Sequence, residues 1–347
     1  MQAAFYGRVA VMMDDLTIWC NQDLTPEAMT ALQDGLGDDR LILPSEFTDN
    51  LGQRVAPPAW SGNFSAGTEN PELALADIAF GQPDPEMILR LPNIRWVQIT
   101  SAGYTRYDRP DFRAALEDHD TAFTNSSSVY ADPCAQHLLG FMLSETRQLL
   151  LAWIDQRGQR TWRHGLRPQM RLLRGENVLI IGYGAIGERL AQLLQPFGAV
   201  VTGLRRRVRG DELAPTFGLD LLSEKLPTAD HVVNILPAHP TTNHFFGPAT
   251  FAQMKPGAVL YNMGRGATVD QDALLAALAS GRLAAAYLDV TDPEPLPADH
   301  PLWDAPNCFI TPHTGGGFAG EHLHLVRHFL ANLARFRANE PLLDVVF

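Results

Sequence analysis

Three polar residues of complementary chemistry follow apolar runs in the second half of the sequence. Arg265 lies between two glycines, Glu294 between two prolines, and His313 directly after Pro312. A guanidinium can bind a carboxylate through two N–H groups, a histidine can transfer a proton near neutral pH, and a neighbouring carboxylate favours the protonated imidazole. Each residue alone is more often structural. Together they predict a site that binds an anionic substrate and exchanges a proton with it.

A glycine cluster precedes these residues in the chain. The stretch Gly182-Tyr183-Gly184-Ala185-Ile186-Gly187 fits G-x-G-x-x-G, follows the apolar run 178–181 and opens the helical pattern 188–194. The first glycine permits a tight turn, the second lets the backbone approach a pyrophosphate, and the third lets the helix pack against the strand. The helix N-terminus then offers N–H groups to the phosphates. This context predicts a dinucleotide site; the alternative is a glycine-rich turn without a ligand.

The residues expected near the adenosine ribose are basic. A domain that binds NAD typically places Asp or Glu about 20 residues after the glycines, where it bonds the ribose 2′-hydroxyl. This sequence has Leu204-Arg205-Arg206 instead. Because a guanidinium pairs well with a 2′-phosphate, NADP(H) is favoured over NAD(H). The alternative is that the arginines form a solvated loop and that Asp211 takes the acidic role.

Apolar runs that alternate with helical patterns must position these residues, and such alternation predicts an α/β fold with mostly parallel sheets. In the first part of the chain the expected strands are 9–13, 41–43, 78–80 and 94–99, with a helix over 26–36 that begins at Thr25-Pro26. Asp132-Pro133 gives the same starting signal for a long apolar helix over 134–151. The polar stretch 157–174 that follows predicts a domain boundary.

The pattern restarts after this boundary. The expected strands are 178–181, 200–201, 231–236, 259–262, 285–290 and 309–310, with a helix over 270–280 that is closed by Gly281. A last helix with one apolar face covers 321–338. The sequence therefore predicts two doubly wound, parallel-sheet domains.

Further motifs make a resemblance to a known family specific. The sequence is similar to the D-isomer-specific 2-hydroxyacid dehydrogenase family over nearly its whole length, and Arg265, Glu294 and His313 match that family's arginine, glutamate and histidine. The family's first substrate loop, linking helix and cofactor loop are matched by Thr100-Ser101-Ala102-Gly103-Tyr104, by Ala135-Gln136-His137-Leu138-Leu139 and by Leu236-Pro237-Ala238-His239-Pro240-Thr241-Thr242.

The resemblance implies a Rossmann cofactor domain over 136–317, inserted into a flavodoxin-like substrate-binding domain formed by 1–135 and 318–347. It also implies a homodimer, and hydride transfer between a nicotinamide and C2 of a small 2-keto or 2-hydroxy acid, as in glyoxylate/hydroxypyruvate reductases. The residues expected to contact the cofactor are Gly182, Tyr183, Gly184, Ala185, Ile186, Gly187, Leu204, Arg205, Arg206, Leu236, Pro237, Thr242, Met263, Gly264, Arg265, Asp289, His313 and Gly315.

The chemistry of a 2-keto acid fits the polar residues. Its carboxylate needs a fixed cation, for which Arg265 is the candidate, and its carbonyl oxygen needs a proton, for which His313 is the candidate donor. Glu294 is the candidate partner of His313. The backbone N–H groups of Ala102 and Gly103 would complete the substrate site, since no bulky side chain obstructs them.

The sequence also bears on two other functions. Some relatives of this fold act as transcriptional corepressors, so a nicotinamide-sensing binding protein is the alternative, although the presence of all three polar residues favours an enzyme. Formate enzymes carry Gln where this chain has Glu294, which counts against formate as the substrate. Gln136 and Thr291 depart from the family's usual acidic and aromatic residues, so no role of that acid can be transferred.

Charge and hydropathy exclude further classes. The 39 acidic and 27 basic residues give a formal charge of −12, which would repel a nucleic acid. No apolar stretch reaches the roughly 18 residues of a membrane span, and Asp14 and Asp15 interrupt the run where a signal peptide would need apolar residues. We therefore expect a cytoplasmic protein with neither a nucleic-acid nor a membrane partner.

Cysteine and histidine spacing gives little support for a metal. Cys20, Cys134 and Cys308 are far apart and show no CxxC pattern, so neither a disulfide framework nor a zinc site is predicted. His324 and His328 are four residues apart, near His322 and Glu321, a spacing that metal ligands use. Without a further ligand, a helix face against the neighbouring domain is the preferred interpretation.

Overall fold

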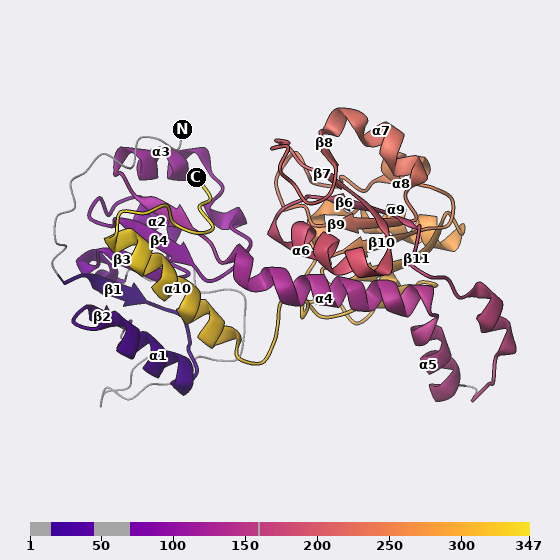
Figure 1. Ribbon diagram of the computed structural model, residues 1–347, viewed down its shortest axis with the longest axis horizontal. Coiled ribbons are helices and arrows are strands. Elements are labelled where there is room, and N and C mark those ends of the chain that lie inside the picture. Colours follow the sequence, from indigo (N-terminus) through magenta and orange to yellow (C-terminus); the bar gives the residue numbers. More distant parts are fainter. Residues whose placement is uncertain (1–14, 45–69, 159) are drawn as a thin grey trace. The chain divides into compact units, whose positions relative to one another are not determined.

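The computed structural model of the chain describes residues 15–44, 70–158 and 160–347. The described residues form two compact units: unit 1 contains the chain up to Val129 together with Phe318–Phe347, and unit 2 is Tyr130–Gly317 (Figure 1). Each unit has one parallel sheet flanked by helices. The predicted α/β class with two parallel-sheet domains is confirmed.

Unit 1 is built around a five-stranded sheet with the order β2-β1-β3-β4-β5. This is the flavodoxin-type order. The expected strand 9–13 lies outside the described residues, and neither β1 nor β5 was predicted, because each is a short run without clear alternation. The strands are β1 (Thr17–Cys20), β2 (Arg40–Ile42), β3 (Ile78–Gly81), β4 (Trp96–Ile99) and β5 (Ala122–Thr124).

Local signals and packing place the helices of unit 1. The first helix begins at Pro26 as predicted, because the Thr25 hydroxyl accepts a hydrogen bond from the Ala28 N–H. The C-terminal helix packs on the same unit, where the Phe329 ring stacks on Phe80 and Trp96 at centroid distances of 4.3 and 5.2 Å. These helices are α1 (Pro26–Leu36), α2 (Pro85–Ile88), α3 (Pro110–Asp118) and α10 (Glu321–Arg337).

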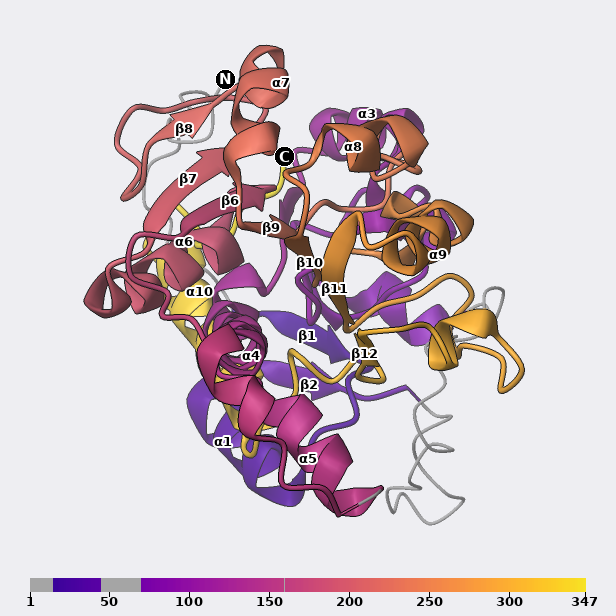
Figure 2. The same cartoon turned by 90° about the vertical axis from the view of Figure 1, so that its right-hand side faces the viewer.

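Unit 2 contains a seven-stranded parallel sheet with the order β8-β7-β6-β9-β10-β11-β12 (Figure 2). Counted along the chain this is the Rossmann order with one strand added beyond β11, and winding reverses between β6 and β9, where such sheets bind ligands. Short β8 was not predicted. The strands are β6 (Asn177–Ile181), β7 (Val200–Leu204), β8 (Thr216–Phe217), β9 (His231–Asn234), β10 (Ala258–Asn262), β11 (Leu283–Leu288) and β12 (Cys308–Ile310).

Helices cover both faces of this sheet, so alternate strand residues fill two separate cores. Val178 and Ile180 pack with residues of α4 and α6, whereas Leu179 and Ile181 pack with residues of α8 and α9. Burial on both faces explains why these strands read as continuous apolar runs. The helices are α4 (Ser127–Thr146), α5 (Leu149–Arg157), α6 (Ala185–Leu194), α7 (Leu222–Lys225), α8 (Pro248–Gln253) and α9 (Gln271–Ala279).

The predicted helix over 134–151 is wrong in its bounds. Helix α4 starts at Ser127 and carries Pro133 in its interior, so Asp132-Pro133 is not a start signal here. The helix tolerates one lost backbone hydrogen bond at that proline. It ends at Thr146, and Gln148, with φ of 55°, separates it from α5. By contrast, the predicted helix that ends at Gly281 is confirmed, because Asp270 caps it through the Ala273 N–H and Gly281 has φ of 71°.

The histidines of α10 contact residues of their own unit. His322 Nδ1 accepts the Thr25 N–H at 3.1 Å, and buried His328 lies 3.3 Å from Asp344 Oδ2. These two side chains therefore have structural contacts within unit 1. Cys20, Cys134 and Cys308, which all lie in the described ranges, form no disulfide with one another. In the described part of the chain, no helix is both long and apolar enough to cross a membrane.

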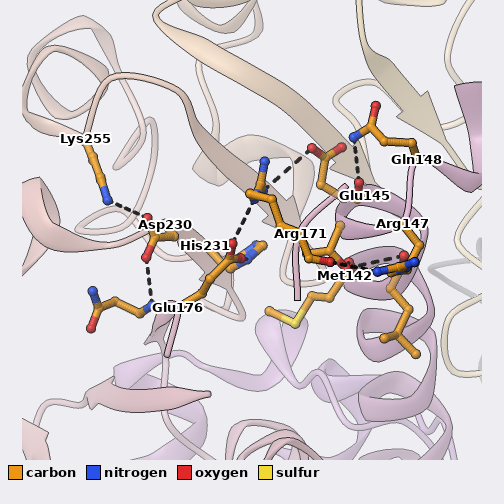
Figure 3. Close-up of polar contacts among 12 residues, drawn as sticks. Met142, Glu145, Arg147, Gln148, Arg171, Glu176, Asp230, His231 and Lys255 are labelled. Atoms are coloured by element: carbon orange, nitrogen blue, oxygen red, sulfur yellow. Dashed lines mark hydrogen bonds and ion pairs between the residues drawn. The ribbon is translucent and has the colours of Figure 1, made fainter. Parts of the chain in front are cut away.

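A buried polar network lies at the amino ends of β6 and β9 (Figure 3). His231 is fully buried; its Nε2 lies 2.5 Å from Glu176 Oε2, and its Nδ1 lies 2.9 Å from the Tyr261 hydroxyl. Arg171 Nε donates to the other Glu176 oxygen at 2.8 Å. Burial raises the pKa of Glu176, but hydrogen bonds from His231 and Arg171 outweigh it and hold the pKa below its usual range.

This network predicts a pH-dependent contribution to stability. Glu176→Gln should lower stability at pH 7 by about 1–3 kcal/mol, the usual value of hydrogen bonds to a charged group. Because the folded-state pKa of Glu176 is depressed, this contribution is present above the unfolded-state pKa and is lost as the pH falls through the folded value. The stabilities of wild type and variant, measured by urea unfolding, should therefore begin to converge as the pH falls below about 4.

The control is Glu340→Gln, the same substitution at a carboxylate that is 59% exposed and 3.9 Å from Arg335. An exposed pair of this kind contributes little. A difference between wild type and Glu176→Gln that stayed constant from pH 7 to pH 3 would contradict the assignment.

Candidate active site

The glycine cluster forms the turn between β6 and α6. Gly182 has φ of 97°, and a Cβ there would lie 2.8 Å from the carbonyl of Ile235, so only glycine fits. A Cβ on Gly187 would lie 3.0 Å from Ile180, which shows how closely α6 packs on β6. A Cβ on Gly184 would meet nothing within 4 Å. The turn thus leaves open space beside Gly184 and the first N–H groups of α6, which fits a pyrophosphate.

The side chain of Tyr183 has a structural place. It is 2% exposed, packs on Gly203 of β7, and its hydroxyl accepts the Ala214 N–H at 3.3 Å. The N–H groups of Gly182 and Tyr183 both donate to the carbonyl of Leu204, at 3.0 and 2.9 Å. These bonds fix the turn against the end of β7. Ala185 and Ile186 are the first two residues of α6, directly after Gly184.

Arg205 and Arg206 follow β7 directly. Arg205 Nη1 donates to Glu212 Oε1 at 2.8 Å, while Arg206 is exposed. Asp211, the acidic alternative from the sequence, is 76% exposed and pairs with Arg209 Nε at 3.2 Å. The acid beside Arg205 is thus Glu212, which the sequence analysis did not consider.

Two buried asparagines, also missed from the sequence, hold the loops that follow β9 and β10. Asn234 Nδ2 donates to Asn262 Oδ1 at 2.9 Å and to the Thr268 hydroxyl at 2.6 Å. Their side-chain oxygens accept the N–H groups of Leu236 and Gly264, both at 3.1 Å. Their position as the polar last residue of a largely apolar strand is the sequence signal that could have identified them.

The same loops contain several predicted cofactor contacts. Met263 is buried, and a Cβ on Gly264 would lie 2.5 Å from the Leu236 carbonyl oxygen, so the two loops are in close contact. The Thr242 hydroxyl donates to the carbonyl of Pro237 at 2.7 Å and closes the loop that follows β9.

His313 and Glu294 form a direct pair. His313 Nδ1 lies 2.9 Å from Glu294 Oε2, and the two side chains are 50% and 38% exposed. Burial raises the pKa of Glu294, but hydrogen bonds from His313 and from the Thr291 N–H outweigh it, so the pKa lies below its usual range. Because an ionised carboxylate can only accept, Nδ1 carries the hydrogen of this bond. Nε2 is the ring nitrogen left for a substrate.

Arg265 lies near this pair. Burial lowers the pKa of Arg265, and the charge of Glu294 opposes that effect. A Cβ on Gly266 would lie 1.9 Å from the Thr291 carbonyl oxygen. Only glycine therefore lets the Arg265 loop lie against the segment that leads to Glu294. Arg265 Nη1 also donates to the carbonyl of Gly264 at 2.6 Å.

Asp289 organises the loop that carries His313. Its buried carboxylate accepts the Thr311 hydroxyl at 2.6 Å and the N–H groups of Thr314 and Gly315, both at 2.9 Å. The His313 N–H donates to the Asp289 carbonyl at 2.8 Å, with His313 at φ of 53°. These contacts hold the histidine in a backbone conformation that residues other than glycine rarely adopt.

Ala102 and Gly103 belong to unit 1, in the loop after β4. The carbonyl of Ala102 accepts from Asn125 Nδ2 at 2.7 Å, and that of Gly103 accepts the Ser101 hydroxyl at 2.7 Å. Both bonds define the orientation of the loop peptides within this unit.

Comparison with known proteins decides the family. The family model for the NAD-binding domain of D-isomer specific 2-hydroxyacid dehydrogenases matches residues 139–315. A glyoxylate reductase from Aeropyrum pernix is 30% identical over 306 residues, which cover 86% of this chain and 89% of that protein. The chain belongs to the D-isomer specific 2-hydroxyacid dehydrogenase family.

Two further relatives support an enzyme of this family. Glyoxylate/hydroxypyruvate reductase B from Citrobacter koseri is 34% identical over 236 residues, 66% of this chain and 70% of that protein. The solved structure of an NADPH-dependent glyoxylate/hydroxypyruvate reductase from Sinorhizobium meliloti, in complex with NADP and sulfate, aligns with a TM-score of 0.74 and 25% identity, covering 96% of this chain and 98% of that one. The protein is a D-2-hydroxyacid dehydrogenase with a nicotinamide cofactor.

Proposed function

We propose that this dehydrogenase reduces short 2-keto acids such as glyoxylate or hydroxypyruvate with NADP(H). The observation that carries the proposal is the His313–Glu294 pair at 2.9 Å, with Arg265 beside it and the glycine turn in the same unit. A site that retains an acid–base pair and a nearby cation favours catalysis over cofactor sensing alone.

In this proposal each side chain has one task. Arg265 binds the substrate carboxylate and polarises the adjacent carbonyl. When bound, the reduced nicotinamide supplies the hydride that C2 accepts. The imidazolium of His313 gives its Nε2 proton to the C2 oxygen, which completes the 2-hydroxy acid. Glu294 holds the ring by Nδ1 and stabilises the charged imidazolium before the proton leaves.

We infer further contacts from the loops that these tasks require. In unit 1, the N–H groups of Ala102 and Gly103 would bind the substrate carboxylate. The glycine turn, the asparagine-held loops after β9 and β10, and Gly315 would hold the dinucleotide. Because Asp289 already accepts three hydrogen bonds from the His313 loop, its first task is to position that loop.

Unit 2 would be the cofactor domain and unit 1 the substrate-binding domain. We also infer a homodimer, because α5 and the segment after it expose several large apolar side chains, and a protein interface would cover such side chains. The exposed side chains are Leu149, Trp153, Ile154, Trp162 and Leu172.

NADP(H) is the proposed cofactor because Arg205 and Arg206 follow β7 and because the acid that the sequence offered for a ribose, Asp211, pairs outward with Arg209. A series of 2-keto acids tested with both reduced cofactors checks the proposal. We expect glyoxylate or hydroxypyruvate to give the highest kcat/KM, at least about tenfold higher with NADPH than with NADH. Equal rates with both cofactors would reject the cofactor preference, and no turnover of any 2-keto acid would reject the activity.

A further inference from the structure

The loop 205–212 after β7 concentrates positive charge in an acidic protein. It holds four arginines and two acids, in a chain whose formal charge is −12. The two acids differ in solvent exposure: the Asp211 side chain is 76% exposed, whereas that of Glu212 is 3% exposed. A buried carboxylate inside an arginine-rich loop requires a physical reason, because burial of a charge is costly unless donors surround it.

Donors surround both oxygens of Glu212. Oε1 accepts the Arg209 N–H and Arg205 Nη1, and Oε2 accepts the Gly210 N–H, each at 2.8 Å. The Arg209 N–H is the largest of the effects that lower the pKa of Glu212, to about 2, so the group is ionised at any working pH. With its oxygens engaged and its surface covered, Glu212 is poorly placed to accept a ribose hydroxyl.

Glu212 instead fixes the arginine that follows β7. It accepts one of the five N–H groups of the Arg205 guanidinium. No contact of the other four with a described residue is seen, and the Arg205 side chain is 22% exposed. Arg209 extends from the same turn toward Glu188 in the first turn of α6, with Nη2 and Oε2 3.9 Å apart. The 209–212 part of the loop therefore contacts both Arg205 and the helix α6, which begins at the glycine turn.

We propose that Glu212 is a positioning residue for cofactor choice: it holds Arg205 and the 209–210 turn in the arrangement that binds a 2′-phosphorylated adenosine. The inference rests on the proposed use of NADP(H) and names the residue that makes the site selective. The inference has an unusual consequence. Removal of the negative charge of Glu212 should weaken phosphate binding, whereas loss of a nearby negative charge ordinarily strengthens it. Fixing a guanidinium in advance lowers the entropy cost of forming its two-point contact.

The test compares Glu212→Gln with Asp211→Asn, the same neutralisation at the adjacent exposed acid. Dissociation constants for NADPH, NADH and 2′,5′-ADP are measured by fluorescence titration and competition. For Glu212→Gln we expect the Kd of NADPH and of 2′,5′-ADP to rise about tenfold, that of NADH to change less than about threefold, and kcat at saturating NADPH to stay within about twofold of wild type. Asp211→Asn should leave NADPH binding unchanged or slightly tighter.

Three results would overturn the inference. Unchanged or tighter NADPH binding by Glu212→Gln would show that its charge repels the phosphate. Selective loss of NADH binding would make Glu212 a ribose acceptor, and equal loss of both cofactors would make its role structural. If Glu212→Gln does not fold, Glu212→Asp replaces it in the test, because aspartate keeps the charge but is too short to reach all three donors. Glu212→Asp should also weaken NADPH binding more than NADH binding. Unchanged NADPH binding would reject the proposal.

Failure of this inference can be told apart from failure of the proposed function. Wild-type protein that binds NADH more tightly than NADPH refutes the cofactor preference without any variant. If wild type prefers NADPH and Glu212→Gln keeps the same preference for NADPH, only the role of Glu212 is refuted. Arg205→Gln provides the reference for loss of the phosphate contact itself.

Discussion

Replacement of His313 by alanine should lower kcat for 2-keto acid reduction about 100- to 10,000-fold, the range that a positioned proton donor contributes. NADPH affinity should change little, because in the proposed function the cofactor is held chiefly by the glycine turn and the loops after β7, β9 and β10. Steady-state rates give kcat, and fluorescence titration gives the Kd of NADPH.

Two comparisons sharpen this prediction. His164→Ala, at an exposed position of unit 2, should behave as wild type. Added imidazole should restore part of the activity of His313→Ala, with greater effect at a pH where imidazole is protonated. A kcat within about threefold of wild type would show that another group gives the proton.

Replacement of Arg265 by glutamine should lower kcat/KM for hydroxypyruvate about 100- to 1,000-fold, the usual cost of removing one donor that stabilises developing charge. Hydroxyacetone, which has a methyl group where hydroxypyruvate has its carboxylate, should be reduced slowly by wild type, and Arg265→Gln should lose much less activity on it than on hydroxypyruvate. We expect this difference because the proposed contact of Arg265 with the carboxylate is missing in hydroxyacetone, whereas its proposed effect on the carbonyl remains.

Arg265→Lys provides the matched control. Lysine keeps the charge but lacks the planar two-point contact, so we expect an activity between those of wild type and Arg265→Gln. Equal losses on hydroxypyruvate and hydroxyacetone would instead assign Arg265 a role in the fold of its loop.

Much of the fold could be predicted because its signals are local. A buried strand followed by glycines and a helix identified the turn over 182–187, and Asp270 with Gly281 marked both ends of α9. Such signals depend on a few neighbouring residues. The start of α4 was missed because Pro133 is tolerated inside that helix, so a local signal was overridden by the longer element.

The sequence suggested the residues of the candidate site but not the neighbouring residues that hold them in place. Arg265, Glu294 and His313 could be chosen because each follows a strand of one parallel sheet. Sequence spacing could not show that Glu212 rather than Asp211 pairs with Arg205, because adjacent side chains diverge and only the folded loop decides which one is buried. The bonds of Asn234 and Asn262 were equally hidden, since they join strands that are distant in the sequence.

The most direct measurement follows the hydrogen that is transferred. Purified protein is mixed with hydroxypyruvate and NADPH that carries deuterium at C4 on one face or the other, and the product is examined by NMR and mass spectrometry. We expect one deuterium at C2 of the hydroxy acid from one of the two labelled cofactors and none from the other. Product without deuterium from both labelled cofactors, or no product at all, would contradict it.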